Sequence, residues 1–421
     1  MSADTLTLLR SGLLTGTARL DLCCGLTEFP QEIFDLADSL EILNLTGNRL
    51  SDLPDDLPRL KKLRILFCSE NDFRYLPPVI AECAGLSMIG FKSNRIERVE
   101  ALPPSMRWLI LTDNRIDQLP ASIGNCQPLQ KLMLSGNRLE NLPDEMAACV
   151  NLELVRLASN RFRSLPEWLL RLPRLAWLAF SGNPFCHEAQ GAESVIEWMD
   201  LQLQEKLGEG ASGVIHRASL VSEERPVAVK IFKGAMTSDG LPASEMAACL
   251  AAGGHPHVIP ILGKITGHPE QAQGLVMELI GSEFSSLAGP PSFESCTRDV
   301  YPPGTIIPLP AVLRIARGMA SVAAALHEKG IIHGDLYAHN MLRNTSGDCL
   351  LGDFGAASFY SGLAGLENIE VRAFGCLLEE LLDHCDSGSV AMRELQEHCL
   401  SMEPTQRPSF SEVLRRLDAL A

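Results

Sequence analysis

Residues 129–143 read Leu129-Gln-Lys-Leu132-Met-Leu134-Ser-Gly-Asn137-Arg-Leu139-Glu-Asn-Leu142-Pro143. The same frame of leucines around one asparagine recurs along the first half of the chain at intervals of 23 residues, with a single interval of 20. The repeated asparagines are Asn48, Asn71, Asn94, Asn114, Asn137, Asn160 and Asn183. A degenerate unit around Gly25 precedes them, so residues 20–186 hold about eight units of one repeat.

Each unit predicts a short strand whose leucines point into the molecule. One unit of this size cannot bury that face alone, so neighbouring units are expected to stack into a curved parallel sheet, an α/β solenoid. The in-phase asparagines are expected to satisfy backbone groups inside the coil. In pattern and period, residues 20–186 resemble the leucine-rich repeat family.

The residues between the inward leucines are expected on the outer, concave surface, because successive strand residues face opposite sides. Apolar and aromatic side chains occupy these positions in most repeats. They are Ile42, Ile65, Phe67, Met88, Trp108, Ile110, Met133, Leu154 and Trp177. Such a stripe predicts a surface that binds a protein partner or substrate. The alternative that stays open is that a second domain of the same chain covers the stripe.

After Leu203 the repeat stops, and a glycine-rich turn follows, Gly208-Glu-Gly210-Ala-Ser-Gly213-Val-Ile215. Its glycines would let backbone N–H groups approach phosphate oxygens without a Cβ in the way. The next run, Val227-Ala228-Val229-Lys230, is typical of a strand, whereas a dinucleotide-binding turn is followed by a helix. Farther on stand His333-Gly-Asp335-Leu-Tyr337-Ala-His339-Asn340 and Asp353-Phe-Gly355. Four motifs in this order resemble the eukaryotic-type protein kinase family over residues 203–421.

This resemblance implies a site for ATP and Mg²⁺. Lys230 would hold the α- and β-phosphates and pair with Glu245, and Asp335 would accept the proton of the substrate hydroxyl. Asn340 and Asp353 would bind Mg²⁺. The other nucleotide contacts that the resemblance implies come from the glycine turn, the apolar plates around adenine and the hinge. They are Gly208, Gly210, Gly213, Ile215, Ala228, Met277, Glu278, Ile280 and Leu342.

The kinase-like region departs from the family pattern in its catalytic loop. Gly334 replaces the arginine that usually grips an activation-segment phosphate, and Tyr337 replaces a lysine near the transferring phosphate. The change at Gly334 leaves the substrate class open, and the change at Tyr337 is expected to slow catalysis.

The activation segment is also short, since only 14 residues separate Gly355 from Glu370. The chain has no A-P-E motif, so Arg407 of the closing R-P motif lacks its usual glutamate, for which Glu367 is a candidate replacement. A Pro- and Ser-rich stretch at 289–304 predicts a loop at the mouth of the expected cleft.

The expected organisation is a leucine-rich repeat domain over residues 1–190, a linker or capping helix over 191–202, and a kinase-like domain over 203–421. The fold class is thus an α/β solenoid followed by an α+β two-lobed domain with a shortened C-lobe. The apolar pattern of Val195, Trp198 and Leu201 favours the capping helix.

Composition narrows the partners and the location. The chain has 421 residues with 36 basic and 52 acidic side chains, a net charge of −16, which argues against nucleic acid and anionic membrane surfaces as partners. The chain has no apolar run of about 18 residues, so no membrane span is predicted. The 13 cysteines form no C-x-x-C pair and no leader sequence is visible, so a cytoplasmic location is expected.

Three functions remain open on the sequence. The first is an ATP- and Mg²⁺-dependent protein kinase in signalling, of the serine/threonine type, whose repeats recruit the substrate or a partner. The second is a repeat scaffold with a pseudokinase domain that binds nucleotide and transfers poorly, which the short activation segment and Tyr337 favour. The third is a small-molecule kinase, which Gly334 favours because an H-G-D motif also resembles that class.

Overall fold

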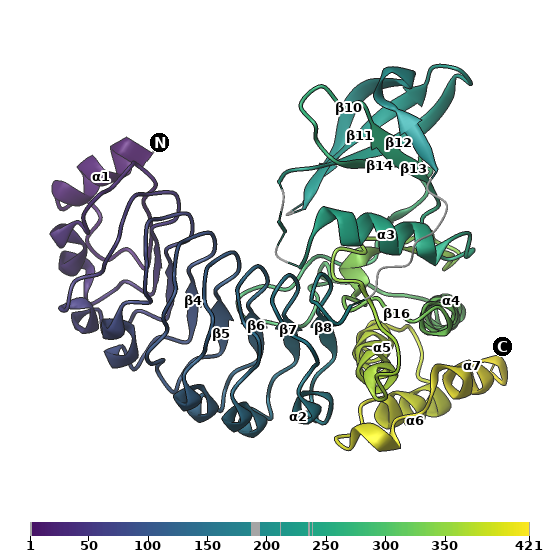
Figure 1. The fold of residues 1–421 in the computed structure, drawn as a ribbon. Coiled ribbons are helices and arrows are strands. Elements are labelled where there is room, and N and C mark those ends of the chain that lie inside the picture. Colours follow the sequence, from purple (N-terminus) through teal and green to yellow (C-terminus); the bar gives the residue numbers. More distant parts are fainter. Residues whose placement is uncertain (1, 187–193, 211, 235, 238, 421) are drawn as a thin grey trace. The chain divides into compact units, whose positions relative to one another are not determined.

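The computed structural model describes residues 2–186, 194–210, 212–234, 236–237 and 239–420 (Figure 1). They form two compact units, Met1–Leu172 and Pro173–Ala421, called here the N-terminal and the C-terminal unit. The last repeat, residues 173–186, thus groups with the kinase-like region.

The N-terminal unit starts with helix α1 (Ser2–Arg10) and then has one three-residue strand in each repeat. These strands are β1 (Arg19–Asp21), β2 (Ile42–Asn44), β3 (Ile65–Phe67), β4 (Met88–Gly90), β5 (Trp108–Ile110), β6 (Lys131–Met133) and β7 (Leu154–Arg156). With β8 (Trp177–Ala179) they make an eight-stranded sheet in sequence order. This confirms the parallel sheet predicted from the repeats.

The middle residue of each strand faces the core. Leu43 lies in register with Leu20 and Leu66, and all three are almost completely buried. The return segments hold short helices, η1 (Gln31–Leu36), η2 (Leu57–Arg59), η3 (Pro78–Glu82), η4 (Ala121–Asn125), η5 (Asp144–Ala148) and α2 (Glu167–Leu170). Between β4 and β5, where every residue is described, the chain forms no helix, which accounts for the one interval of 20 residues.

The repeated asparagines hold the coil together, and Asn137 illustrates how. Its side-chain Nδ2 donates to the carbonyl oxygens of Leu111 and Leu134, each at 2.9 Å. Its Oδ1 accepts from the backbone N–H of Ile116 at 3.0 Å. One buried amide therefore satisfies three backbone groups in neighbouring turns, as expected from the sequence.

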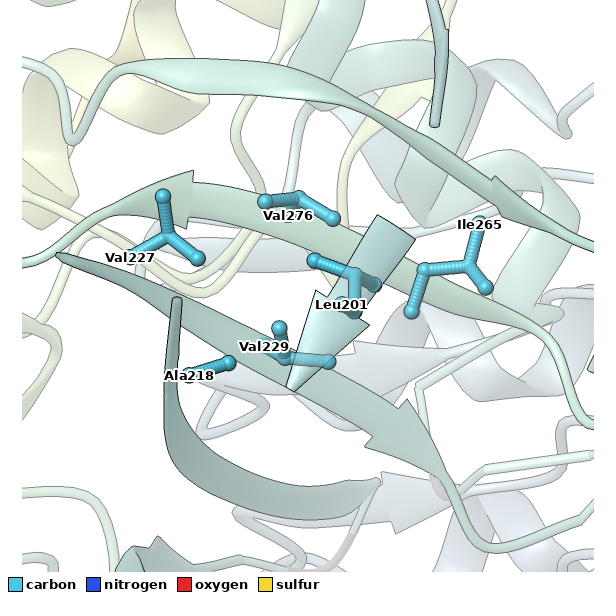
Figure 2. Packing of buried hydrophobic residues seen from close by; sticks show 6 residues of the cluster. All are labelled: Leu201, Ala218, Val227, Val229, Ile265 and Val276. Atoms are coloured by element: carbon cyan, nitrogen blue, oxygen red, sulfur yellow. The ribbon is translucent and has the colours of Figure 1, made fainter. Parts of the chain in front are cut away.

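The N-lobe of the C-terminal unit is a six-stranded sheet with strand order β10-β11-β12-β14-β13-β9. Its strands are β9 (Val195–Glu197), β10 (Leu201–Glu209), β11 (Gly213–Leu220), β12 (Arg225–Phe232), β13 (Ile261–Thr266) and β14 (Gly274–Glu278), and helix α3 (Pro242–Ala252) packs beside them. Figure 2 shows the cluster of apolar side chains that the strands bury on one face, among them Leu201, Val229 and Val276.

The C-lobe is built around helix α4 (Leu309–Glu328), which packs against α5 (Leu366–Asp383) and α7 (Phe410–Asp418). Its other elements are β15 (Ser285–Ser286), β16 (Ile331–Ile332), η7 (Ala338–Asn340), β17 (Met341–Arg343), β18 (Cys349–Leu351), β19 (Ser358–Phe359), α6 (Val390–Cys399) and η8 (Pro404–Gln406). Among the described residues, α4 alone is long and apolar enough to cross a membrane. More than half of its apolar window is buried, as in the core helix of a globular lobe.

The segment that links the repeats to the glycine turn differs from the expectation. Residues 191–193 lie outside the described residues, Val195–Glu197 form β9 in parallel pairing with β13, and Trp198–Asp200 form the single turn η6. The predicted capping helix over 191–202 is therefore wrong. Ile196 and Trp198, two residues apart, both pack on the N-lobe core, so the apolar pattern follows the period of a strand and pairs with a free sheet edge.

The asparagine ladder gives a first prediction. Replacing Asn137→Ala leaves three buried backbone groups without partners, so we expect the free energy of unfolding to fall by about 2–4 kcal/mol. Urea unfolding followed by circular dichroism measures the change. Asn125→Ala, at an exposed position in η4, is the matched control and should change the free energy by less than about 0.5 kcal/mol. Equal midpoints for the two variants would contradict the structural role of the ladder.

Candidate active site

The glycine turn joins β10 to β11, and its glycines differ in the space that surrounds them. A Cβ on Gly213 would lie 2.6 Å from the carbonyl oxygen of Ile231, so β11 can approach β12 only with glycine at this position. A Cβ on Gly208 or Gly210 would meet nothing within 4 Å, and the space beside them is open. Residue 211 lies outside the described residues. The Gly210 N–H donates to the carbonyl oxygen of Gly213 at 2.9 Å and closes the turn, while the open space beside Gly208 and Gly210 leaves room for a ligand.

A buried ion pair connects the sheet to helix α3. The ammonium of Lys230 in β12 contacts the Glu245 carboxylate, and Lys230 Nζ lies 3.8 Å from Asp353 Oδ1. Burial lowers the pKa of Lys230, but the charges of Asp353 and Glu245 outweigh it and raise that pKa overall. Burial raises the pKa of Glu245 to about 7, and its Oε2 is buried without a hydrogen-bond partner in the described part of the chain. The structure therefore forms the predicted pair of Lys230 and Glu245 and also brings Asp353 beside it.

Asp335 and Asn340 face each other across the catalytic loop. Asn340 Nδ2 donates to Asp335 Oδ2 at 2.8 Å and to the Asp335 carbonyl at 2.9 Å. Next to Asp353, which has a left-handed φ of 48°, Phe354 is buried and packs edge-on against His333 at a centroid distance of 4.8 Å. Gly352, which precedes Asp353, donates its backbone N–H to the carbonyl oxygen of Asn340 at 2.9 Å, so Asp353 lies next to the Asp335–Asn340 pair.

Helix α5 contacts the start of the catalytic loop through Glu370. Glu370 Oε1 accepts from the backbone N–H of Gly334 at 2.9 Å, and its Oε2 lies 2.8 Å from His327 Nε2. His327 Nδ1 in turn lies 2.6 Å from the hydroxyl of Tyr360. Glu370, which stands where the family has an aspartate, thus anchors the start of the catalytic loop to two helices.

Gly334 has a steric reason to be a glycine. Its φ is +72°, and a Cβ would lie 2.6 Å from the carbonyl oxygen of Leu178 and 2.8 Å from that of Ala356. The backbone of β8 fills the place where the family's arginine side chain would begin. The departure from the family motif therefore follows from the approach of the last repeat.

The residues expected around adenine come from both lobes. Ala228 in β12 lies in register with Met277 in β14, and Ile215 in β11 lies in register with Lys230. Leu342 lies in β17. Glu278 ends β14 and accepts from Arg225 Nη2 at 2.8 Å, and Ile280 follows it in the hinge.

The Pro- and Ser-rich stretch at 289–304 reaches the catalytic loop. Asp299 accepts from the backbone N–H of His339 at 2.9 Å and lies 2.7 Å from His339 Nδ1. Glu380 in α5 accepts from the Asp299 N–H at 3.3 Å and from the Tyr301 hydroxyl at 3.4 Å. The sequence analysis missed Asp299 and Glu380, because no motif marks a loop residue that meets the catalytic loop only in the folded chain.

The apolar stripe that was predicted to bind a partner is exposed only in part. Ile65, Met88 and Leu154 are buried, whereas Phe67, Trp108 and Ile110 keep part of their surface exposed. Trp177 is only 1% exposed and stacks on Tyr337. The prediction that Trp177 is available to a partner is therefore wrong, and for this residue the alternative holds that the kinase-like region covers it.

Comparison with known families agrees with this division. The chain matches the protein tyrosine and serine/threonine kinase family over residues 201–365. It matches leucine rich repeat families over residues 39–60, 104–162 and 127–185. The chain thus consists of leucine-rich repeats, within residues 39–185, followed by a protein kinase domain in residues 201–365.

The similar curated proteins are distant and are matched only in part. Human Cyclin-dependent kinase 11B is 26% identical over 224 residues, which are 52% of this chain and 26% of the relative. Human Cyclin-dependent kinase 10 is 26% identical over 225 residues, 47% of this chain and 58% of the relative. Serine/threonine-protein kinase PITSLRE of Drosophila melanogaster is 26% identical over 173 residues, 41% of this chain and 17% of the relative.

The carboxyl of Glu380 gives a pH prediction. Burial beside the negative charge of Asp299 raises its pKa to about 8, well above that of an exposed glutamate. The folded protein therefore binds this proton more tightly than the unfolded chain does. Glu380 thus makes the free energy of unfolding fall by up to about 1 kcal/mol per pH unit as the pH rises between about 5 and 8.

Glu380→Gln removes the titrating group at nearly constant shape. Urea unfolding of both proteins across this pH range should show that the wild type loses stability more steeply than the variant. Parallel curves would mean that the carboxyl titrates near its ordinary pKa in the folded protein.

Proposed function

We propose that the chain is an ATP- and Mg²⁺-dependent protein kinase of the serine/threonine type, whose repeats bind its protein substrate or partner. The observation that carries the proposal is the convergence of Lys230, Glu245 and Asp353 beside the Asp335–Asn340 pair. The serine/threonine assignment rests on the printed names of distant relatives, among them the kinase PITSLRE.

The residues present fit a magnesium site that substrate phosphates complete. The Asp353 side chain is 51% exposed, and Asn340 offers an amide oxygen because its Nδ2 is the atom bound to Asp335. Carboxylate and amide oxygens suit Mg²⁺, which in kinases takes few protein ligands. The described residues hold no cluster of three or more His, Cys, Asp or Glu side chains that could bind a metal alone.

The chain's own residues then have distinct tasks. ATP would supply the phosphoryl group, and Mg²⁺ would neutralise part of its charge. Lys230, kept in place by Glu245, would hold the α- and β-phosphates. Asp335 would orient the substrate hydroxyl and accept its proton at a carboxylate oxygen, and its bond to Asn340 would keep that carboxylate aimed.

Phosphate transfer from labelled ATP tests this proposal on the full chain, with a generic basic protein as acceptor. Asp335→Asn should reduce the rate by about 10²–10⁴-fold, since it removes the proton acceptor. Binding of ATP, measured as a thermal shift, should persist. Asp353→Ala should abolish transfer, and Lys230→Met should weaken both transfer and ATP binding.

Asp383→Asn is the matched control, because this exposed aspartate pairs with Arg393 on the C-lobe surface. Its transfer rate should equal that of the wild type. Full activity in Asp335→Asn would refute the assignment. A wild type that binds ATP and labels no protein would favour the pseudokinase scaffold, and transfer to small hydroxyl compounds alone would favour a small-molecule kinase.

The proposed docking surface is the part of the concave stripe that keeps exposed apolar area, Phe67, Trp108 and Ile110. The Lys131 ammonium lies over the Trp108 ring, 4.3 Å from its centroid, so one face of this aromatic ring carries a cation. Binding here would raise the effective concentration of a substrate near the kinase domain.

Trp108→Glu tests the docking surface. In a heat-inactivated cell extract with labelled ATP, we expect the variant to label its substrate proteins at least about tenfold more slowly, because a buried charge opposes apolar docking. Labelling of the generic acceptor should be unchanged. Val150→Glu, at an exposed apolar residue outside the strands, is the control. Equal labelling by all three proteins would remove the docking surface from the proposal.

A further inference from the structure

The last repeat contacts the catalytic loop directly. The ring of Trp177 in β8 stacks on that of Tyr337 at a centroid distance of 4.2 Å and an angle of 8°. Its indole Nε1 donates to the carbonyl oxygen of Leu336 at 3.3 Å. Trp177 and Tyr337 are both buried and both belong to the C-terminal unit. Trp177 thus touches the two residues that follow Asp335.

Two buried guanidinium groups of the C-lobe also depend on this repeat. Arg407 donates to the carbonyl oxygen of Pro173 at 2.7 Å, and Arg372 donates to that of Arg174 at 3.1 Å. Both arginines are at most 6% exposed. A buried cation needs several acceptors, and each of these carbonyls supplies one of them beside those that the C-lobe itself provides.

The same contacts replace what the short activation segment lacks. Arg407 has no A-P-E glutamate and donates instead to Pro173, to Asn368 and to Ser401, the latter two carbonyls at 2.9 Å. Glu367, the candidate replacement, accepts from the N–H of Phe410 at 2.9 Å and so caps α7. Phe180 of the repeat donates its N–H to Ser358 Oγ in β19 at 2.9 Å. The repeat therefore holds the segment that follows Asp353.

The stretch at 289–304 also contacts the indole. The guanidinium carbon of Arg298 lies 5.3 Å from the centroid of the Trp177 ring. The next residue, Asp299, binds His339 of the catalytic loop. Trp177 thus contacts both the catalytic loop and the stretch at 289–304.

We propose that Trp177 is a positioning residue for phosphoryl transfer: the last repeat takes over the role of an activation segment and aims Asp335 through the Tyr337 stack. This inference rests on the proposed kinase function. It adds that residues 173–186 serve catalysis itself as well as the repeat array. It also accounts for Gly334. Where the last repeat replaces a phosphorylated activation segment, an arginine at position 334 has no phosphate to bind.

The test uses the full chain and separates kcat from KM. Trp177→Ala should lower kcat about 10–100-fold, because a small misplacement of a catalytic carboxylate has effects of this size. KM for ATP should stay within about twofold, since Trp177 does not touch the residues proposed to bind the nucleotide. Trp177→Phe keeps an aromatic ring against Tyr337 and should restore most of the rate. A residue with a merely structural role would not give this split with rescue.

Trp168→Ala is the matched control, a tryptophan in α2 of the preceding repeat that lies in the N-terminal unit. It should leave kcat unchanged. The stack can also be broken from the other side, so Tyr337→Leu serves if Trp177→Ala does not fold. Where Trp177→Ala folds, the double variant Trp177→Ala, Tyr337→Leu should be no slower than Tyr337→Leu alone, because both changes remove the same interaction.

The outcomes distinguish this inference from the function on which it rests. A wild type that transfers no phosphoryl group overturns the kinase function and this inference with it. A wild type that transfers, together with a folded Trp177→Ala or Tyr337→Leu variant of unchanged kcat, overturns the inference alone. A fall in kcat that Trp177→Phe does not rescue also contradicts it, because the aromatic stack would then not be the cause.

Discussion

The Lys230–Glu245 ion pair is the interaction on which the proposed chemistry depends. It joins β12 to α3, two elements that no continuous backbone hydrogen bonding connects, and it lies in an interior where an unpaired charge would be costly. Glu245 meets the nearby negative charge of Asp353 as well, which leaves one ammonium between two carboxylates. An added cation would balance this excess of negative charge and allow a phosphate group to approach, so the site suits a metal and an anion together.

The sequence predicted the repeat sheet and the pairing of Lys230 with Glu245, and in both cases short motifs with regular spacing carried the information. A fixed period carries the inward leucines and the asparagine ladder, and each of these residues meets a partner about one repeat away. The kinase motifs likewise keep chemistry-bearing residues at short spacings, such as Asp335 and Asn340. Their side chains converge without any information about the rest of the fold.

What the sequence did not reveal depends on contacts between distant segments. Trp177 has the pattern of an exposed concave residue, yet Tyr337, 160 residues later in the chain, covers it. Ile196 and Trp198 suit a helix or a strand over so short a stretch, and the free edge of β13 decides for the strand. Asp299 and Glu380 belong to no motif, and their roles appear only when α5 and the loop at 289–304 pack together.

The departures of this kinase domain from its family share one cause. Gly334, the unpaired R-P arginine and the short activation segment would separately suggest a decayed enzyme. In the fold, each of them meets a backbone carbonyl or N–H of residues 173–186: Leu178 beside Gly334, Pro173 at Arg407, and Phe180 at Ser358. A kinase domain that had lost its activation segment and motif residues by random mutation would contain cavities and unsatisfied cations. Here the same repeat fills the space and accepts the hydrogen bonds. An activation segment ordered by phosphorylation can be switched, whereas release of this repeat would take hydrogen-bond acceptors from two buried guanidinium groups. Under the proposed function, control would therefore act through a partner of the repeats or through access of substrate to the catalytic loop.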